Sequence, residues 1–235
     1  MRGHSRTTNT ASALRLALPA CSRSSAPGLV LEQRVLSLGY RLIAGIDEAG
    51  RGAWAGPVVA AAVILPLDRL DLLPLLKDVN DSKKLTARQR EQVALQIESL
   101  AIAAGVGSAS AAEIDRLGIV PATRLAMRRA VANLNPAPEA LLIDAVDLTR
   151  HVPLPQHALY YGDAISLSIA AASILAKLSR DRLMARLDAH YPGYGFERHK
   201  GYGTSAHRAA LARLGASDIH RQSFAPVKAC RARED

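Results

Sequence analysis

The apolar positions early in the chain predict a short helix followed by two strands. Leu29–Leu38 has the spacing of a helix, whereas Tyr40–Asp47 alternates apolar and polar positions in the manner of a strand. Val58–Leu65 is a continuous apolar run, which is typical of a buried strand. The glycine-rich reversal between Gly50 and Pro57 predicts that the two strands pair as an antiparallel ribbon.

Two capping-box patterns mark the starts of later helices. Thr86-Ala-Arg-Gln89 predicts a helix to about Leu100, and Ser110-Ala-Ala-Glu113 predicts one that ends near Gly118. The other elements expected from periodicity and from breaks at proline are strands over residues 101–108 and 140–144 and helices over 121–134 and 164–189. Helices and strands that alternate in this way indicate an α/β fold.

Composition supports one main domain. The chain has 235 residues, of which 49% are hydrophobic and 4% aromatic, so the core must consist mostly of Ala, Leu, Ile and Val. No apolar run is long enough to cross a bilayer, and we expect a soluble protein with no membrane association. Cys21 and Cys230 are the two cysteines, which indicates no disulfide framework and favours a reducing, cytoplasmic location.

The charge favours a polyanionic partner. The net charge is +9, from 30 basic and 21 acidic residues. Part of this surplus lies in a terminal segment, because residues 1–36 carry five arginines and one glutamate, or +4. Residues 1–27 lack any acid, a composition shared by organellar transit peptides and disordered extensions, and we expect a disordered extension.

Four acids stand out by their positions. Asp47 and Glu48 come at the end of the first strand, Asp144 ends a later strand, and Asp163 precedes the long helix. Converging carboxylates repel one another, so their gathering at one site is best explained by Mg²⁺ or Mn²⁺. No His or Cys is placed to complete a zinc site. Taken singly, Asp163 could instead cap the helix, and Asp144 could be solvated.

A glycine-flanked arginine follows the first acid pair. In Gly50-Arg51-Gly52 the two glycines lack Cβ atoms, so the backbone can be approached closely, and the guanidinium can bind a phosphate. This turn could hold a nucleic acid strand against a metal ion bound by Asp47 and Glu48.

Several motifs in order resemble one family. They are Gly45–Gly52 with Gly56-Pro57, Asp81–Leu85, Gly162-Asp163, Ile169–Lys177, Arg180-Asp181, Tyr194–Phe196, His199–Tyr202 and His220–Phe224. Over residues 28–229 or so the chain resembles ribonuclease HII, the type 2 ribonuclease H. Ribonuclease HIII fits less well, because that group has Gly-Lys-Gly where this chain has Gly50-Arg51-Gly52.

The resemblance implies an RNase H-like fold, an α/β architecture with a five-stranded mixed sheet flanked by helices and a C-terminal helical extension. The implied domains are a catalytic domain over residues 28–190 and a substrate-binding extension with a basic tail over 191–235. Residues 1–27 would precede both domains. We expect a monomer.

The resemblance also implies an activity. The family cleaves the RNA strand of RNA–DNA hybrids endonucleolytically and cuts 5′ to single ribonucleotides in duplex DNA, leaving 3′-hydroxyl and 5′-phosphate ends. Asp47, Glu48, Asp144 and Asp163 match its four metal-binding acids, which would bind two Mg²⁺ or Mn²⁺ ions. One departure is visible, because Ala145 stands where the family usually has a glycine.

The residues themselves and the resemblance together indicate substrate contacts. Gly50, Arg51 and Gly52 are suited to detect the 2′-hydroxyl, and Tyr202 would stack on a neighbouring deoxyribose. Candidate phosphate contacts are Lys83, Lys84, Lys177, Arg180, Lys200 and Arg221, although any of them could belong to a solvated basic face. Ser173 and Lys177 lie four residues apart, hence on one helical face, and the resemblance favours them as residues of the cleft.

Two other functions remain open. The chain could be a catalytically silent nucleic-acid-binding module, against which the presence of all four acids counts. It could also be another RNase H-like nuclease, such as a resolvase, against which the Gly50–Gly52 motif and Tyr202 count.

His199, His207 and His220 do not predict a metal site, because they lie in the substrate-binding extension of the family. The basic C-terminal segment lacks the aromatic pattern needed to dock on a sliding clamp.

Overall fold

A computed structural model describes residues 26–79 and 85–231. Its centre is a five-stranded sheet with the order β3-β2-β1-β4-β5. The strands are β1 (Ile43–Ala49), β2 (Val58–Ile64), β3 (Ala103–Ala109), β4 (Ala140–Asp144) and β5 (Gln156–Leu159). β2 runs antiparallel to β1 and β3, whereas β4 runs parallel to β1 and β5. The predicted mixed sheet and the antiparallel ribbon of β1 and β2 are confirmed.

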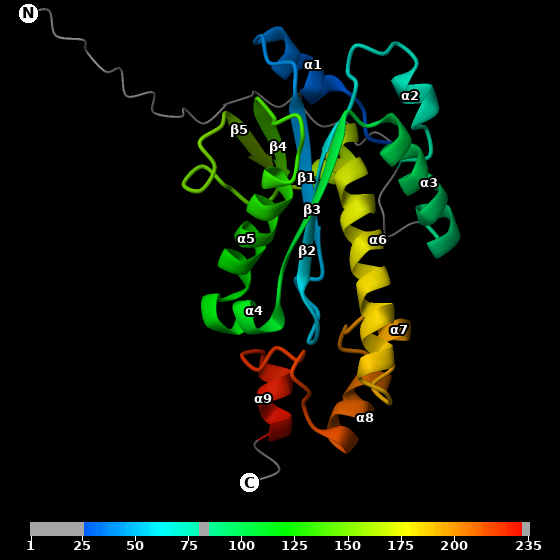
Figure 1. The fold of residues 1–235 in the computed structure, drawn as a ribbon, viewed down its shortest axis with the longest axis vertical. Helices are drawn as coiled ribbons and strands as arrows, with labels where there is room; N and C mark the ends of the chain where they lie inside the picture. The colour runs from blue at the N-terminus through cyan, green and yellow to red at the C-terminus, as the bar shows by residue number, and fades with distance from the viewer. Residues whose placement is uncertain (1–25, 80–84, 232–235) are drawn as a thin grey trace, which may run out of the picture.

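Helices cover both faces of this sheet (Figure 1). On one face lies α5 (Ile119–Ala132), with α4 (Ala111–Leu117) beside it; on the other lies α6 (Leu167–His190), with α3 (Ala87–Leu100) packed outside it. β2 is therefore buried along its whole length, which explains its continuous apolar sequence. The shorter helices are α1 (Val30–Ser37), α2 (Leu72–Leu75), the 3₁₀ turn η1 (Gly162–Ala164), α7 (Phe196–His199), α8 (Ser205–Leu214) and α9 (Ala225–Arg231).

Small residues let α6 approach the central strand closely. A Cβ atom on Gly45 of β1 would lie 2.1 Å from the backbone carbon of Ser168 in α6. Real atoms do not approach so closely, so this position requires glycine. The contact places the middle of β1, directly before its acid pair, against the buried first half of α6.

Helix starts agree with the capping signals in two cases and depart from prediction in two. Thr86 and Ser110 both form the predicted capping boxes. α5 begins at Ile119, so Pro121 lies within its first turn and not at its first position. α6 is capped by Ser166, whose hydroxyl accepts a hydrogen bond from the amide of Ile169.

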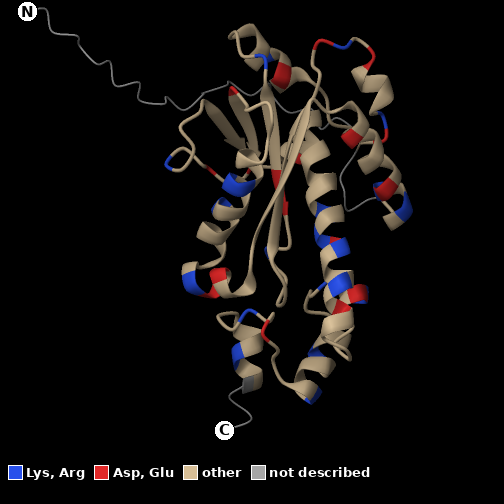
Figure 2. Ribbon diagram, in the orientation of Figure 1, with Lys and Arg blue, Asp and Glu red and all other residues tan. Residues whose placement is uncertain are grey.

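The C-terminal helices α7, α8 and α9 lie beyond one end of the sheet (Figure 1). In Figure 2, Lys and Arg positions gather along the half of α6 nearest these helices. Within the described residues, no helix has both the length and the apolarity needed to cross a membrane.

Candidate active site

One pocket collects the predicted residues. Its volume is about 700 Å³, and it opens where the ends of β1, β4 and β5 face α6. The predicted residues that line it are Asp47, Glu48, Gly50, Arg51, Gly52, Asp144, Asp163, Ser173, Lys177 and Tyr202. Two of the predicted phosphate contacts, Lys83 and Lys84, lie outside the described residues.

The acidic wall of this pocket, formed by Asp47, Glu48, Asp144 and Asp163, concentrates negative charge. Asp47 is 5% exposed and lies within β1, which ends at Ala49, two residues later than predicted. Burial raises the pKa of Asp47 well above its usual range, and the nearby carboxylates of Glu48 and Asp144 raise it further. A hydrogen bond from Ser173 to Asp47 partly offsets these effects. Ser173 therefore stabilises the ionised form of Asp47, which Glu48 and Asp144 destabilise.

Each of the other acids of the wall is held by a local contact or turn. A carboxylate oxygen of Glu48 lies 3.1 Å from the Arg51 guanidinium. Asp144 Oδ1 accepts a hydrogen bond of 2.8 Å from the amide of Gly162, so Asp144 is tied to the chain next to Asp163. Asp163 lies in η1, one turn ahead of the Ser166 cap. The alternative in which Asp163 caps the long helix is therefore wrong.

Ala145 adopts the backbone conformation that explains why a glycine is usual there. Its φ is +53°, in the left-handed region that costs a non-glycine residue about 1–2 kcal/mol. The turn is nevertheless formed, because the Ala145 amide donates to the carbonyl of Leu159 at 2.9 Å. The methyl group thus leaves Asp144 at the pocket.

Two of the predicted phosphate contacts are wrong. Arg180 and Arg221 are both fully buried, so neither guanidinium can reach a nucleic acid from the surface. Arg221 donates to the carbonyls of Gly50, Arg51 and Gly56, and Arg180 donates to those of Ala55, Pro57 and Lys200. Together they brace residues 50–57, which we call the braced turn. Sequence analysis could not find this role, because burial of an arginine leaves no local pattern.

The two glycines around Arg51 differ in what they require. Gly50 has a φ of +95°, and a Cβ atom there would lie 1.9 Å from Arg180 Nε, so the fold itself demands glycine. At Gly52 φ lies outside the positive range, and a Cβ atom would meet no described atom within 4 Å. The fold does not explain Gly52, whereas close approach of a ligand would.

The remaining wall carries cations and an aromatic ring. Lys177 Nζ and the Arg180 guanidinium lie 5.9 Å and 5.3 Å from the centre of the Tyr202 ring. Lys177 also pairs with Asp181 at 2.7 Å. Lys200, by contrast, donates to the carbonyl of Glu197 and does not line the pocket.

The donor set suits a hard divalent cation. Carboxylate oxygens are the ligands that Mg²⁺ and Mn²⁺ prefer, and a cation would counter both the burial and the repulsion that raise the pKa of Asp47. In residues 26–79 and 85–231, no three His, Cys, Asp or Glu side chains close on a common point to form a metal centre. The acids fit the ions in chemistry and location, and Glu48, which pairs with Arg51, would have to turn toward them.

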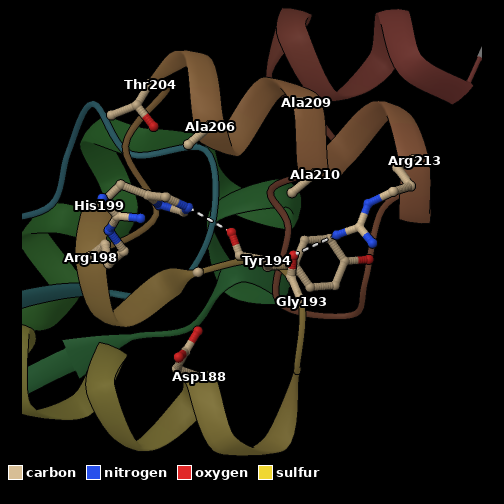
Figure 3. Close-up of a pocket in the computed structure, with 11 residues that line it drawn as sticks. Asp188, Gly193, Tyr194, Arg198, His199, Thr204, Ala206, Ala209, Ala210 and Arg213 are labelled. Atoms are coloured by element: carbon tan, nitrogen blue, oxygen red, sulfur yellow. Dashed lines mark hydrogen bonds between the residues drawn. The ribbon is translucent and has the colours of Figure 1, made fainter.

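A second pocket of about 720 Å³ lies among the C-terminal helices (Figure 3). Its described lining holds one acid, Asp188, together with Arg198 and Arg213. Arg213 donates to the carbonyl of Gly193, and His199 bonds that of Tyr194. Without a group of carboxylates this pocket does not offer a comparable cation site.

The mixed sheet, the acids at the ends of its adjacent strands and the cationic wall define the class of protein as an RNase H-like nuclease. Comparison with known proteins narrows this class. The family model for ribonuclease HII matches residues 44–227. The chain therefore belongs to the ribonuclease HII family, whose members are metal-dependent endoribonucleases that act on the RNA of RNA–DNA hybrids.

Individual relatives support the assignment to this family. A ribonuclease HII of Geobacillus thermodenitrificans is 56% identical over 197 residues, which cover 84% of this chain and 73% of the relative. One from Chloroflexus aurantiacus is 55% identical over 201 residues, or 86% and 94% of the two chains. The crystal structure of ribonuclease H2 from Pyrococcus horikoshii aligns with a TM-score of 0.67 and 25% identity, and the alignment covers 81% of this chain and 97% of that one. The RNase H-like fold is confirmed.

Proposed function

We propose that Asp47, Glu48, Asp144 and Asp163 bind two Mg²⁺ or Mn²⁺ ions and that the pocket cuts 5′ to single ribonucleotides in duplex DNA as well as within hybrids. The observation that carries this proposal is the burial of Asp47 beside two further carboxylates in a pocket that Arg51 and Lys177 also line. Bound ions would lower the pKa of a water and offset negative charge on the departing 3′-oxygen.

The chain's own residues position the substrate. The open space at Gly52 admits a sugar, and Arg51 can bind the adjacent phosphate once Glu48 turns to an ion. Ser173 and Lys177 project from the same face of α6 into the pocket, where Lys177 adds positive charge near the scissile phosphate. No Ser, Cys or His nucleophile is required.

Tyr202 supplies a flat surface for a deoxyribose next to the ribonucleotide. The cationic groups of Lys177 and Arg180 lie against its ring and hold the ring at the rim of the pocket. Lys83 stays a proposed phosphate contact. Single-ribonucleotide recognition then depends on two contacts, one to the 2′-hydroxyl near Gly52 and one to the next sugar at Tyr202.

Cleavage of a defined duplex tests this function. The protein is incubated with Mg²⁺ or Mn²⁺ and a duplex DNA that carries one ribonucleotide, with an all-DNA duplex of the same sequence as control. We expect a single cut 5′ to the ribonucleotide, with 3′-hydroxyl and 5′-phosphate ends, and no cut in the control. An intact ribonucleotide-containing strand would refute the proposal, and binding without cleavage would favour a silent binding module.

We also propose that the protein acts as a monomer and in the cytoplasm, as its two cysteines and single main domain suggest. A chromatographic mass near 25.0 kDa would support the monomer, and a mass twice as large would refute it.

A further inference from the structure

Two tyrosines that the sequence analysis did not single out lie on the rim of the acidic pocket. Tyr160 and Tyr161 directly follow β5, and both line the pocket that holds Asp144 and Asp163. Their side chains are 77% and 79% exposed. Within the described part of the chain, neither side chain forms a hydrogen bond or a ring contact, so internal packing does not explain these tyrosines. We call these two residues the aromatic pair.

The backbone holds this aromatic pair in place. Tyr161 has φ of +60° and ψ of +34°, a left-handed conformation that is unusual for a bulky residue. The turn is tied on both sides, because the Gly162 amide donates to Asp144 and the Ala164 amide donates to the Tyr161 carbonyl at 3.1 Å. Strained residues that the surrounding structure maintains concentrate at ligand-binding sites.

Strand order puts the aromatic pair and Tyr202 at opposite ends of the pocket. Tyr202 contacts Arg180, which braces the turn between β1 and β2, whereas the aromatic pair follows the edge strand β5. The acid-bearing strands β1 and β4 lie between these ends. β1 and β5 are two strand spacings apart, roughly 10 Å, which corresponds to about three base-pair steps of a duplex.

We propose that the rings of the aromatic pair pack against sugars of the bound hybrid on the side of the cleaved phosphodiester opposite Tyr202. The proposal rests on the function proposed above, and it makes Tyr160 and Tyr161 determinants of substrate affinity. A ring face accepts any nucleotide sequence, which suits an enzyme that must bind regardless of sequence. The acids would then act on a phosphodiester held between two aromatic contacts.

Binding measured without divalent cations tests this inference independently of catalysis. Fluorescence anisotropy with a labelled RNA–DNA hybrid compares the parent protein with a Tyr160→Ala/Tyr161→Ala variant. We expect the dissociation constant to rise about 5- to 100-fold, as removal of stacked aromatics does elsewhere. A Tyr160→Phe/Tyr161→Phe variant keeps the ring faces and should restore the lost affinity. Leu70→Ala, at a fully exposed site away from the pocket, is the matched control.

Two results of the binding comparison would overturn the inference. An alanine variant that binds within twofold of the parent would overturn the inference, and so would a phenylalanine variant as weak as the alanine variant, because hydroxyl groups would then make the contact. Tyr160→Ala alone, at an ordinary backbone position, replaces the double variant if the latter melts early. Failure of the parent to cleave a ribonucleotide would refute the proposed function, yet the binding comparison would still decide the role of the aromatic pair.

Discussion

The acidic wall and the braced turn line one pocket, but they are held by opposite means. On the acidic wall, burial opposes the ionisation of Asp47, and the carboxylates of Glu48 and Asp144 oppose it further. At the braced turn, Arg180 and Arg221 are buried as well, but each donates three hydrogen bonds to backbone carbonyls. The acidic wall therefore concentrates charge at a cost in stability, whereas the braced turn uses buried charge to fix a backbone shape.

The strongest test of the acidic wall is Asp47→Asn. Cleavage should fall by about 10³-fold or more, because a central ligand of the proposed ions is lost. The free energy of unfolding in EDTA should rise by about 1–2 kcal/mol, because a buried repelling charge is removed. Asp218→Asn, at an exposed position, should change neither quantity. Loss of stability in Asp47→Asn would contradict the repulsion argument.

Removal of Arg221 from the braced turn should lower the free energy of unfolding, whereas Asp47→Asn should raise it. Arg221→Ala leaves the carbonyls of Gly50, Arg51 and Gly56 without their donor, and we expect a loss of about 3–5 kcal/mol in urea unfolding. Arg51→Ala, in the same turn but 40% exposed, should cost less than about 1 kcal/mol while weakening hybrid binding. Equal destabilisation by the two variants would show that burial does not distinguish these arginines.

The two glycines of the turn should differ in effect, because Gly50 is required by the fold and Gly52 by the proposed ligand. Gly50→Ala should destabilise by about 2–3 kcal/mol, since its Cβ would strike Arg180 at a positive φ. Gly52→Ala should leave the melting temperature unchanged but raise the KM for hybrids, because its Cβ would occupy open space. A normal KM for Gly52→Ala would remove the argument that a sugar approaches this residue.

Asp47 and the two buried histidines of the C-terminal extension, His207 and His220, should also differ in how they make stability depend on pH. Asp47 has a raised folded-state pKa, so its ionisation weakens the fold as pH rises, and the stability difference between Asp47→Asn and the parent should vanish on acidification. Burial lowers the pKa of His207 and His220 to about 4, from 6.5. The unfolded chain then takes up protons first, and each histidine should cost roughly 1–3 kcal/mol as pH falls from 6.5 to 4.

Urea unfolding in EDTA between pH 4 and pH 8, a range that brackets both effects, measures this difference. His207→Asn should flatten the acid side of the parent's stability curve, because one of the two histidines no longer titrates. An unchanged slope would mean that the buried contact between His207 and His220, whose Nε2 atoms are 3.1 Å apart, does not control the acid response.

The smallest effect is expected at Ala145. Ala145→Gly should stabilise by about 0.5–1 kcal/mol, because it removes the left-handed strain while giving back part of the gain as chain entropy. Ala209→Gly, at an exposed position inside α8, should destabilise by a similar amount. Thermal unfolding of the two variants gives the comparison, and a destabilised Ala145→Gly would show that the turn carries no strain.

Local signals explain which elements the sequence predicts well. The capping boxes at Thr86 and Ser110 and the strand before Asp144 depend on neighbours in the chain, and the structure has them at or near the predicted residues. β5 has four residues next to prolines and exists through its pairing with β4, so its segment has no strand pattern of its own.

The same distinction holds for the pocket. The Gly50–Gly52 motif and the acids are recognisable as residues in a row, but the bracing by Arg221 joins positions 170 or so residues apart in the chain. Long-range burial of this kind cannot be inferred from periodicity. Tyr160 and Tyr161 were adjacent to the Gly162-Asp163 motif, and that proximity was the available signal for their place on the rim.

The length of α6 has a consequence for where the strand is cut. This helix of 24 residues is about 36 Å long; it carries Ser173 beside Asp47 and, two turns later, Arg180, which holds the carbonyl of Lys200 near Tyr202. In the proposed complex, the reacting phosphate and the neighbouring sugar would therefore be spaced along one helix. The rise per residue of α6, and not the bases of the duplex, would then set the position of the cut.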